Sequence, residues 1–501
     1  MMEKKLGELF CYPVFVDDSK KFEIEITFLI ERLKARFFII PQNVCETPQK
    51  MKSLITSIRK KSSEALYFGV YAGGGAQLPF SKNVTLIPSN MTTGFSGKAK
   101  NSTVMAGVLA SELKAIGIDF VISDFLNINL HSYNPLVGPN AFGDQPDGIK
   151  EYIENYIKAF KKEGILLIGR HFPGIGGLNE FLDDKINTSH RTLTEMFEEE
   201  IVNFRNAIEY GIHGIELSSV YYFKESKKVA ESAVFSPDIV DFLTNTLKYS
   251  ELIVSAPLFE KKFKDYNPVN TPRKAFDAGC NFIIMPHGLS NSTKSWDDFL
   301  LSIKKGEIEE EKIEKINNVH FFEENLKQGS KKSLFYQKKD NSKHIYKILL
   351  ESIKIFHGKK VWENFKNLSD IMVVAPETMM FDIEAKNNYF FKSVRNYKRT
   401  AEFFEYAIEP ENDFINRVKQ KASKKEGVIY FSYSSHLSNS RENLGIALSR
   451  VNENTVIVGI DSPYEYGIFT DSPCYACIAS YYENAIQAVS EKLFKGSDPY
   501  N

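Results

Sequence analysis

The sequence predicts an α/β protein: a (β/α)8 barrel of the TIM type followed by a smaller α/β sandwich domain. Its length of 501 residues predicts two to four domains at roughly 100–200 residues each. Between residues 35 and 290, short apolar runs alternate with longer amphipathic stretches, and seven strand–helix repeats in about 250 residues match the size of such a barrel. A charge-dense connector then precedes a second run of the same alternation. An open doubly wound sheet is the competing interpretation of the first pattern.

The predicted barrel strands are nearly unbroken apolar runs rich in Val, Ile and Phe, which suits parallel strands buried on both faces. They span residues 35–41, 65–72, 119–129, 165–172, 213–222, 251–259 and 281–287. An eighth strand is expected near the N-terminus or after His287. The segments of helical periodicity between the strands span 47–62, 101–117, 147–164, 193–211 and 236–250. Three of these helices end in glycine, the usual C-terminal stop: Gly117, Gly164 and Gly211.

A change of composition separates the two predicted domains. Residues 304–312 are dense in charge, and residues 328–345 have the character of an exposed connector. We therefore expect a barrel over 1–327, a linker over 328–345 and a sandwich over 346–501. In the second domain the predicted strands span 370–375, 428–434 and 455–461, and the predicted helices span 390–408, 413–424, 440–450 and 481–494.

The balance of charge gives no electrostatic reason to expect nucleic acid or an anionic membrane as a partner. There are 63 Lys and Arg against 64 Asp and Glu, for a formal net charge of -1. No apolar run reaches the roughly 18–20 residues of a membrane span, and the first residues are too polar for a signal peptide. Five cysteines, an odd number, argue for a reducing compartment, so the cytoplasm is the expected location. Cys474 and Cys477 are interpreted as two buried thiols on a helix.

The loop after the predicted strand 165–172 carries the most distinctive motif. It reads Gly-Arg-His-Phe-Pro-Gly-Ile-Gly-Gly over residues 169–177, and a cation beside a histidine on a rigid loop can hold hydroxyl groups. The motif resembles K-H-F-P-G-H-G of glycoside hydrolase family 3, most closely in its bacterial β-N-acetylglucosaminidase branch. Other stretches resemble the family in the same order along nearly the whole chain: 65–80 with 87–89, 122–129, 134–143, 204–208 and 456–494. The resemblance implies the two-domain fold and, as a partner, an amino sugar or a cell-wall fragment. No cofactor or metal is predicted.

At its catalytic positions the sequence departs from the family it resembles. The family's carboxylate nucleophile corresponds to Ala256, in the sixth predicted strand, and a methyl group cannot form a glycosyl ester. The Asp and His of the branch's acid/base pair correspond to Phe181 and Asp183. A shifted loop would instead offer His190 without its Asp.

The sugar-holding positions depart from the family as well. Only the family's Lys-His pair has a counterpart of the same chemical type, Arg170 and His171. Arginine keeps the positive charge of lysine but presents its hydrogen-bond donors in a different geometry. The family's other charged positions correspond to Tyr71, Ala76, Asn127, Asn140 and Ser219. The predicted substrate-binding residues are accordingly Arg170, His171, Asn127 and Asn140.

The loss of all these groups together predicts that the barrel no longer carries out the family's hydrolysis. The protein is then expected to act as a carbohydrate-binding or scaffold protein. The alternative is an active glycosidase with relocated carboxylates: Asp124, Asp183 and Glu216, with Asp184 and Glu260 also at strand ends. Glu216 stands between two apolar residues of a strand, and a carboxyl group facing a barrel interior is costly unless it has a partner. A functional role and a structural ion pair both remain open for it. A third hypothesis is an interaction protein whose barrel mouth is plugged by Tyr71, Phe181 and Tyr221.

Overall fold

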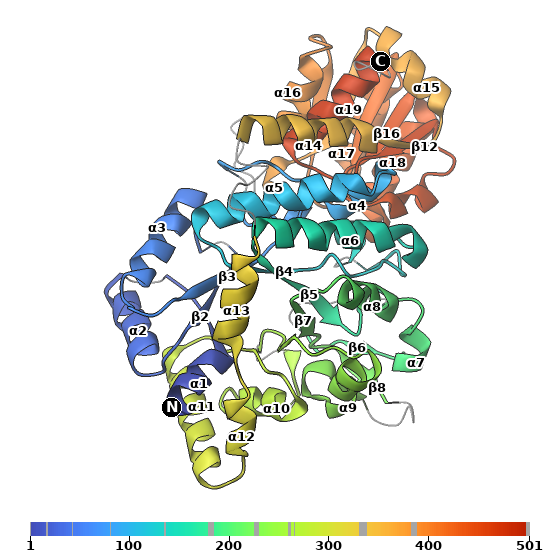
Figure 1. The fold of residues 1–501 in the computed structure, drawn as a ribbon. Helices are drawn as coiled ribbons and strands as arrows, with labels where there is room; N and C mark the ends of the chain where they lie inside the picture. The colour runs from blue at the N-terminus through green and yellow to red at the C-terminus, as the bar shows by residue number, and fades with distance from the viewer. Residues whose placement is uncertain are drawn as a thin grey trace.

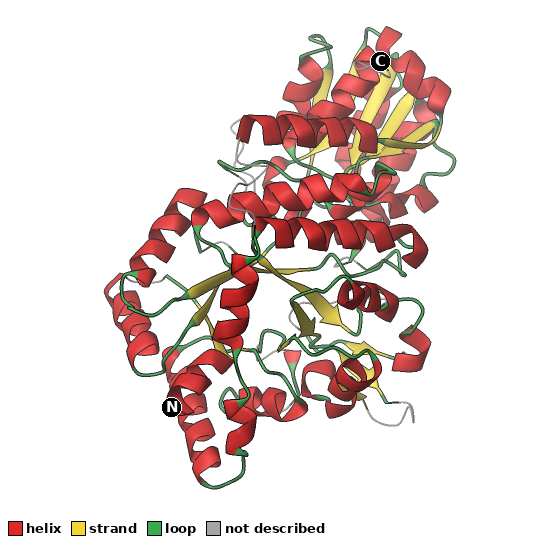
Figure 2. Cartoon of the chain, viewed as in Figure 1, coloured by secondary structure: helices red, strands yellow, loops and turns green. Residues whose placement is uncertain are grey.

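A computed structural model describes the chain over 2–16, 19–42, 44–80, 82–134, 137–178, 185–224, 230–258, 262–264, 266–329, 338–381 and 388–496. Figures 1 and 2 show strands enclosed by a ring of helices, and a second α/β domain packed against one side of that ring. Both domains predicted from the sequence are therefore present.

Eight parallel strands form the barrel, and their order around it follows the order along the chain. Each strand pairs with the next, β11 pairs with β1, and an isolated parallel bridge between Val254 and Phe282 closes the ring. The strands are β1 (Phe10–Pro13), β2 (Phe37–Ile40), β3 (Tyr67–Tyr71), β4 (Phe120–Ser123), β5 (Leu166–Phe172), β7 (Gly214–Leu217), β10 (Leu252–Val254) and β11 (Ile283–Ile284). The predicted barrel is confirmed. Its eighth strand is the N-terminal β1, so the strand before Ala256 is the seventh in the ring.

One predicted strand, 213–222, is divided between two sheets. Its first part is β7 of the barrel, and its end belongs to β8 (Tyr221–Phe223). A small separate sheet contains β8 together with β6 (Thr188–Ser189) and β9 (Ala230–Ser232). Only Ser218, Ser219 and Val220 separate the two strands, so the sequence analysis merged them into one.

Helices cover the outer face of the barrel (Figure 2). The predicted glycine stops hold for α5 and α6, where Gly117 and Gly164 take left-handed φ angles of 101° and 70°. The longer helices are α2 (Ser19–Glu31), α3 (Pro48–Arg59), α5 (Lys100–Ile116), α6 (Pro146–Glu163), α8 (Ile201–Glu209), α10 (Asn270–Ala278), α11 (Leu289–Lys304) and α13 (Asn318–Lys327). The shorter ones are α1 (Met2–Leu9), α4 (Asn90–Phe95), α7 (Leu193–Met196), α9 (Pro237–Asp241) and α12 (Glu310–Glu314).

Aromatic side chains fill the amino-terminal end of the barrel. Phe322 of α13 is fully buried, and its ring centroid lies 4.7 Å from that of Phe37, 5.2 Å from Tyr67 and 5.5 Å from Phe120. These three residues begin β2, β3 and β4. Tilted and edge-on pairs at such distances are the favourable arrangements of aromatic rings. Because this end is filled, a ligand site is expected at the opposite end, where the strands terminate.

The second domain is a six-stranded sheet with the order β12-β17-β16-β15-β13-β14. Its strands are β12 (Lys354–His357), β13 (Ile371–Pro376), β14 (Glu402–Tyr406), β15 (Gly427–Ser432), β16 (Thr455–Gly459) and β17 (Cys474–Cys477), and only β12 is antiparallel to its neighbour. Its helices are α14 (Lys338–Ser352), α15 (Lys359–Asn364), α16 (Tyr389–Arg395), α17 (Asn412–Ala422), α18 (Asn439–Val451) and α19 (Glu483–Lys495). The α14 helix begins inside the segment predicted as a linker.

Two predictions for the second domain were wrong. Residues 390–408 are not one helix, because α16 ends at Arg395 and β14 follows. As an edge strand of mixed exposure, β14 lacks the continuous apolar run by which buried strands were recognised. Cys474 and Cys477 are buried as predicted, but they lie on the short strand β17 rather than on a helix.

The two domains meet along α4, α5 and α14 and along the loop that follows β3 (Figure 1). Buried hydrogen bonds join them: the Ser89 hydroxyl donates to the carbonyl of Ala479 at 2.6 Å, and the Thr92 hydroxyl donates to that of Ile478 at 2.7 Å. Within the described ranges, no helix combines the length and the apolar character needed to cross a bilayer.

Candidate functional site

Polar side chains from four neighbouring strands gather at the carboxyl end of the barrel. Tyr71 is the last residue of β3, Asp124 follows β4, Arg170 lies on β5 and Glu216 on β7. Arg170 and Glu216 are register partners, and alternate residues of a strand share a face. Arg170 therefore faces the barrel interior with Ile168, which belongs to the interior hydrophobic cluster. The structure thus brings together Asp124 and Glu216, the two described carboxylates that the sequence singled out.

Asp124 is bound as an ion pair. It is 1% exposed, and its Oδ1 accepts a hydrogen bond from Arg170 Nε while its Oδ2 accepts one from Gln77 Nε2. Burial alone raises the pKa of Asp124, but the charge of Arg170 and these two hydrogen bonds outweigh it, so the pKa lies below its usual value. Asp124 is therefore an ionised group at neutral pH.

Glu216 is in a different environment. It is fully buried, and the Tyr71 hydroxyl donates to its Oε2 at 3.0 Å, while its Oε1 has no hydrogen-bond partner. Burial, together with the nearby charge of Asp124, raises the pKa of Glu216 to about 7, although Arg170 and the Tyr71 bond counteract it. The Arg170 guanidinium lies 4.7 Å from the centroid of the Tyr71 ring. Arg170 therefore contacts both Asp124 and the tyrosine that binds Glu216.

The Tyr71→Phe variant is expected to lose about 1–2 kcal/mol of unfolding free energy, because Oε2 of Glu216 stays buried without a donor. The loss should be greater at pH 8 than at pH 5, since the phenol hydrogen bond favours the ionised carboxylate. Urea unfolding at the two pH values measures it. Tyr133→Phe, at a half-exposed tyrosine, is the control and should leave the midpoint unchanged. An equal loss in both variants would contradict the role given to the Tyr71–Glu216 bond.

Two further predicted binding residues border the cluster. Burial and the neighbouring Arg170 lower the pKa of His171 to about 3, so His171 is a neutral imidazole at pH 7. Its Nδ1 lies 3.5 Å from Nδ2 of Asn127, which also donates to the carbonyl of Asp124 at 3.0 Å. The Oδ1 of Asn127 is buried without a hydrogen-bond partner. Arg170, His171 and Asn127 therefore form a continuous polar strip on the ends of β4 and β5.

The other predicted positions lie outside that strip or beyond the described residues. Asn140 is buried in a short 3-10 turn, where its carbonyl accepts a hydrogen bond from Asn90 at 2.8 Å. The ring of His190 stacks on Phe223 of the small sheet, with the centroids 5.4 Å apart. The Tyr221 hydroxyl accepts from the backbone of Lys264 at 2.9 Å. Residues that lie outside the described ranges are Phe181, Asp183, Asp184 and Glu260.

Ala256 follows β10 and is 2% exposed. It packs within the larger hydrophobic cluster, and its neighbour Ser255 is tied to β11 because the Ser255 hydroxyl accepts from the backbone of Ile284 at 2.9 Å. A buried methyl group offers no nucleophile and no proton. In the part of the chain that the structure describes, no three His, Cys, Asp or Glu side chains come together as a metal site requires.

Sequence reasoning missed Gln77. It lies on a short 3-10 turn, η1 (Gly75–Gln77), directly after the three glycines that follow β3. The glycines did indicate a tight turn or a close approach of the backbone. Nothing in the sequence, however, indicates that the amide of Gln77, six residues beyond β3, contacts the carboxylate of Asp124, which follows β4.

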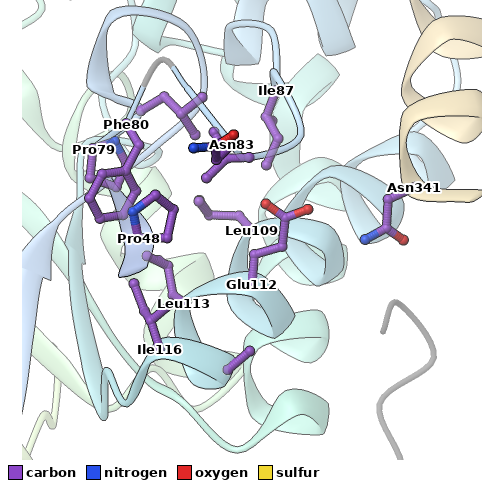
Figure 3. Close-up of a pocket in the computed structure, with 13 residues that line it drawn as sticks. Pro48, Pro79, Phe80, Asn83, Ile87, Leu109, Glu112, Leu113, Ile116 and Asn341 are labelled. Atoms are coloured by element: carbon purple, nitrogen blue, oxygen red, sulfur yellow. The ribbon is translucent and has the colours of Figure 1, made fainter. Parts of the chain in front are cut away.

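A hollow of about 160 Å³ lies away from the barrel mouth, between the loop after β3, α5 and the start of α14 (Figure 3). Its walls are mostly apolar, with Phe80, Leu109 and Leu113 among them. Glu112 at its edge is engaged, because its carboxylate accepts hydrogen bonds from the backbone and the hydroxyl of Thr85. The hollow contains none of the predicted site residues.

Curated relatives of the chain are beta-hexosaminidases. The protein of Nitrosomonas eutropha is 26% identical over 267 residues, which are 52% of this chain and 74% of that protein. The protein of Methylobacillus flagellatus is 26% identical over 284 residues, which are 55% of this chain and 78% of that protein. The chain is thus similar to these enzymes across its barrel.

Solved structures are similar over both domains. A glycoside hydrolase family 3 beta-N-acetylglucosaminidase from Paenibacillus sp. has a TM-score of 0.85 at 19% identity and covers 99% of this chain and 97% of its own. A beta-glucosidase from Listeria innocua has a TM-score of 0.75 at 13% identity, over 99% of this chain and 73% of its own. At such identities the likeness concerns the fold. The family model for the N-terminal domain of glycosyl hydrolase family 3 matches residues 1–319, well over half of the chain. The protein therefore belongs to glycosyl hydrolase family 3.

Proposed function

We propose that this protein binds an amino sugar or a cell-wall fragment in its barrel mouth and does not hydrolyse N-acetyl-β-glucosaminides. One observation carries the proposal: the described carboxyl groups of the mouth are already engaged within the protein. Asp124 is held by Arg170 and Gln77, and Glu216 is held by Tyr71. At the position that we assign to the family's nucleophile stands Ala256, whose methyl group cannot attack an anomeric carbon.

The remaining polar groups suit binding. The Arg170 guanidinium still has donors to offer beyond its bond to Asp124, His171 is neutral and can donate or accept, and Oδ1 of Asn127 is an acceptor without a partner. Sugar hydroxyls are both donors and acceptors, so such a strip matches them. We assign Arg170, His171 and Asn127 to ligand binding, with Asn140 as a further residue predicted from the family resemblance.

A second candidate function is supported by the environment of Glu216. A carboxyl group with a pKa of about 7 keeps its proton near neutrality, which is what a general acid needs to protonate a leaving oxygen. Among the residues that the structure describes, its Oε1 has no hydrogen-bond partner. In this alternative the protein is an active glycosidase with relocated carboxylates: Glu216 is the acid and the ionised Asp124 is the second carboxylate.

A chromogenic N-acetyl-β-glucosaminide separates the two functions. We expect no release of the chromophore above the buffer rate between pH 5 and 8, and a saturable heat when N-acetylglucosamine is titrated into the protein. The heat should be lost in the Asn127→Leu variant, which removes both polar atoms of that side chain. Release that disappears in Glu216→Gln would overturn the proposal in favour of the glycosidase. If neither chromophore release nor binding heat is observed, only the scaffold role remains.

The location of the protein stays a prediction. All five cysteines are buried and unpaired thiols, which agrees with the reducing compartment expected from their odd number. We propose the cytoplasm on this ground.

A further inference from the structure

We propose that the second domain sets the geometry of the barrel mouth through one loop, which makes Tyr482 and Gln77 positioning residues for the ligand site. This inference rests on the proposed binding function. The loop comprises residues 72–89 and is called the glycine loop below: it leaves β3, contains η1, and ends at Ser89, the N-cap of α4. It contacts the second domain on one side and Asp124 on the other.

The second domain holds the glycine loop by hydrogen bonds from a single short segment, residues 478–484. The Tyr482 hydroxyl donates to the carbonyl of Gly75 at 2.9 Å, and the Asn484 amide donates to that of Leu86 at 2.8 Å. At the end of the loop, the Ser89 hydroxyl donates to the carbonyl of Ala479 at 2.6 Å. The Tyr482 and Ser89 bonds are buried, so water does not readily replace them.

The first and last parts of the glycine loop contact each other, so a restraint on one part also restrains the other. The backbone N–H of Gly75 donates to the carbonyl of Ile87 at 2.9 Å. A Cβ on Gly74 would lie 1.9 Å from the carbonyl oxygen of Pro88, and Gly75 has a φ of +61°. Glycine is therefore required at both positions for this close approach.

From Gly75 the chain leads within one turn to the ligand site. Gly75 begins η1 and Gln77 ends it, and the backbone N–H of Gly73 donates to the carbonyl of Gln77 at 3.1 Å. The Gln77 side chain then donates to Asp124, the carboxylate that pairs with Arg170. The contact with Tyr482 is thus only two residues away from the one that orients Asp124.

One side of the glycine loop borders an unfilled space, although Phe80 and Ile87 are themselves buried in the core. Leu78, Phe80 and Ile87 line the hollow of about 160 Å³ shown in Figure 3, where no protein atoms press against them. A segment that borders an unfilled space gains less from dispersion contacts than one in a close-packed core. The hydrogen bonds to the second domain therefore restrain the loop that carries Gln77, together with the core packing of Phe80 and Ile87 and the bonds of Thr85 to Glu112.

The test is Tyr482→Phe in the full chain, which removes the hydroxyl and keeps the ring. Hydrogen exchange of the amides in 73–78 should become about 3- to 10-fold faster, the change that corresponds to one ordinary hydrogen bond. The affinity for N-acetylglucosamine should fall by a similar factor. The acidic limb of its pH profile should move to higher pH, as in Gln77→Ala, because Asp124, which lies beside His171 on β5 and opposite Tyr71 on β3 and Glu216 on β7, then keeps its charge through Arg170 alone.

Tyr406→Phe is the matched control, since this buried hydroxyl donates to the carbonyl of Phe431 at 2.8 Å, inside the second domain and away from the segment 478–484. It should leave both exchange in 73–78 and the pH profile as in the wild type. Unchanged exchange in Tyr482→Phe, or equal acceleration in both variants, would overturn the inference, as would a loss of affinity without the shift of the acidic limb. Absence of any heat with the wild type would refute the proposed binding function, while the exchange measurement would still decide whether the second domain restrains the loop.

Discussion

The Arg170→Ala variant is expected to lose about 3–5 kcal/mol of unfolding free energy at pH 7, the usual cost of removing one partner of a buried ion pair. Asp124 is 1% exposed, and the variant leaves it with Gln77 as its remaining strong hydrogen-bond donor. Glu216 is affected as well, because the charge of Arg170 counteracts the effect of burial on its pKa. The expected loss is therefore that of two buried carboxyl groups deprived of their neighbouring cation rather than of one surface contact.

The loss should depend on pH with a definite sign. In the wild type the pKa of Asp124 is lowered, so its contribution to stability is present above pH 4 and is lost as the pH falls through the folded-state pKa. Without Arg170, burial raises the pKa of Asp124 above its unfolded value, and the contribution is lost as the pH rises instead. Urea midpoints of the two proteins should accordingly be closest below pH 4, where Asp124 is protonated in both, and diverge towards pH 8.

Two variants test this account of Arg170. Adding Asp124→Asn to Arg170→Ala should recover part of the loss, since it removes the charge that has no partner. Arg32→Ala breaks an exposed pair with Asp297 at 3.4 Å and should cost less than about 1 kcal/mol. If Arg170→Ala costs no more than Arg32→Ala, the ion pair does not hold the barrel mouth together.

The sequence was sufficient to predict the barrel because its strands are buried on both faces. Such strands are continuous apolar runs, and their helices end in glycines such as Gly117 and Gly164 that the structure places in the left-handed region. The same criterion failed where burial is one-sided. The edge strand β14 has mixed exposure and was predicted as helix, and β7 and β8 were merged because only three residues separate them.

The candidate site was predictable in its residues but not in their pairing. Asp124, Arg170 and Glu216 lie within the predicted strands 119–129, 165–172 and 213–222, and the function of such a barrel is expected at the carboxyl ends of its strands. Which carboxylate pairs with Arg170 depends on register and side-chain direction, and these follow from the closed ring rather than from any local pattern. The role of Gln77 and its restraint by Tyr482 could not be predicted for the same reason. The hydrogen bond between Tyr482 and Gly75 joins residues about 400 positions apart in the sequence.

The Glu465→Gln variant is expected to be more stable than the wild type in alkaline solution, by an amount on the order of 5 kcal/mol at pH 9. Glu465 lies in η9 (Pro463–Ile468) of the second domain and is fully buried. Burial and the neighbouring Asp461 raise its pKa to about 8, against weaker opposing effects of the Ser432 hydroxyl and Arg441. The wild type must therefore ionise a buried carboxyl group at high pH, whereas the amide of glutamine stays neutral.

The sign of this effect follows from the direction of the shift. A carboxyl group whose folded-state pKa exceeds its unfolded value contributes stability below the unfolded pKa, and this contribution is lost as the pH rises through the folded pKa. The difference between Glu465→Gln and the wild type should thus be small at pH 4, grow from about pH 4.5, and level off above pH 8. Denaturant unfolding of both proteins across this range measures it.

Glu216→Gln provides an internal comparison, because the two glutamates differ in the pH at which the gain should level off. The gain for Glu216 should stop growing near pH 7 and amount to about 3 kcal/mol, while that for Glu465 should continue to pH 8. Glu310→Gln, on the exposed face of α12, should show neither gain. A Glu465→Gln protein less stable than the wild type at pH 9 would mean that the ionised carboxylate is stabilised by Arg441 and the Ser432 hydroxyl. Glu465 would then resemble Asp124, whose ionised form the fold stabilises. It would differ from Glu216, whose protonated form the fold favours.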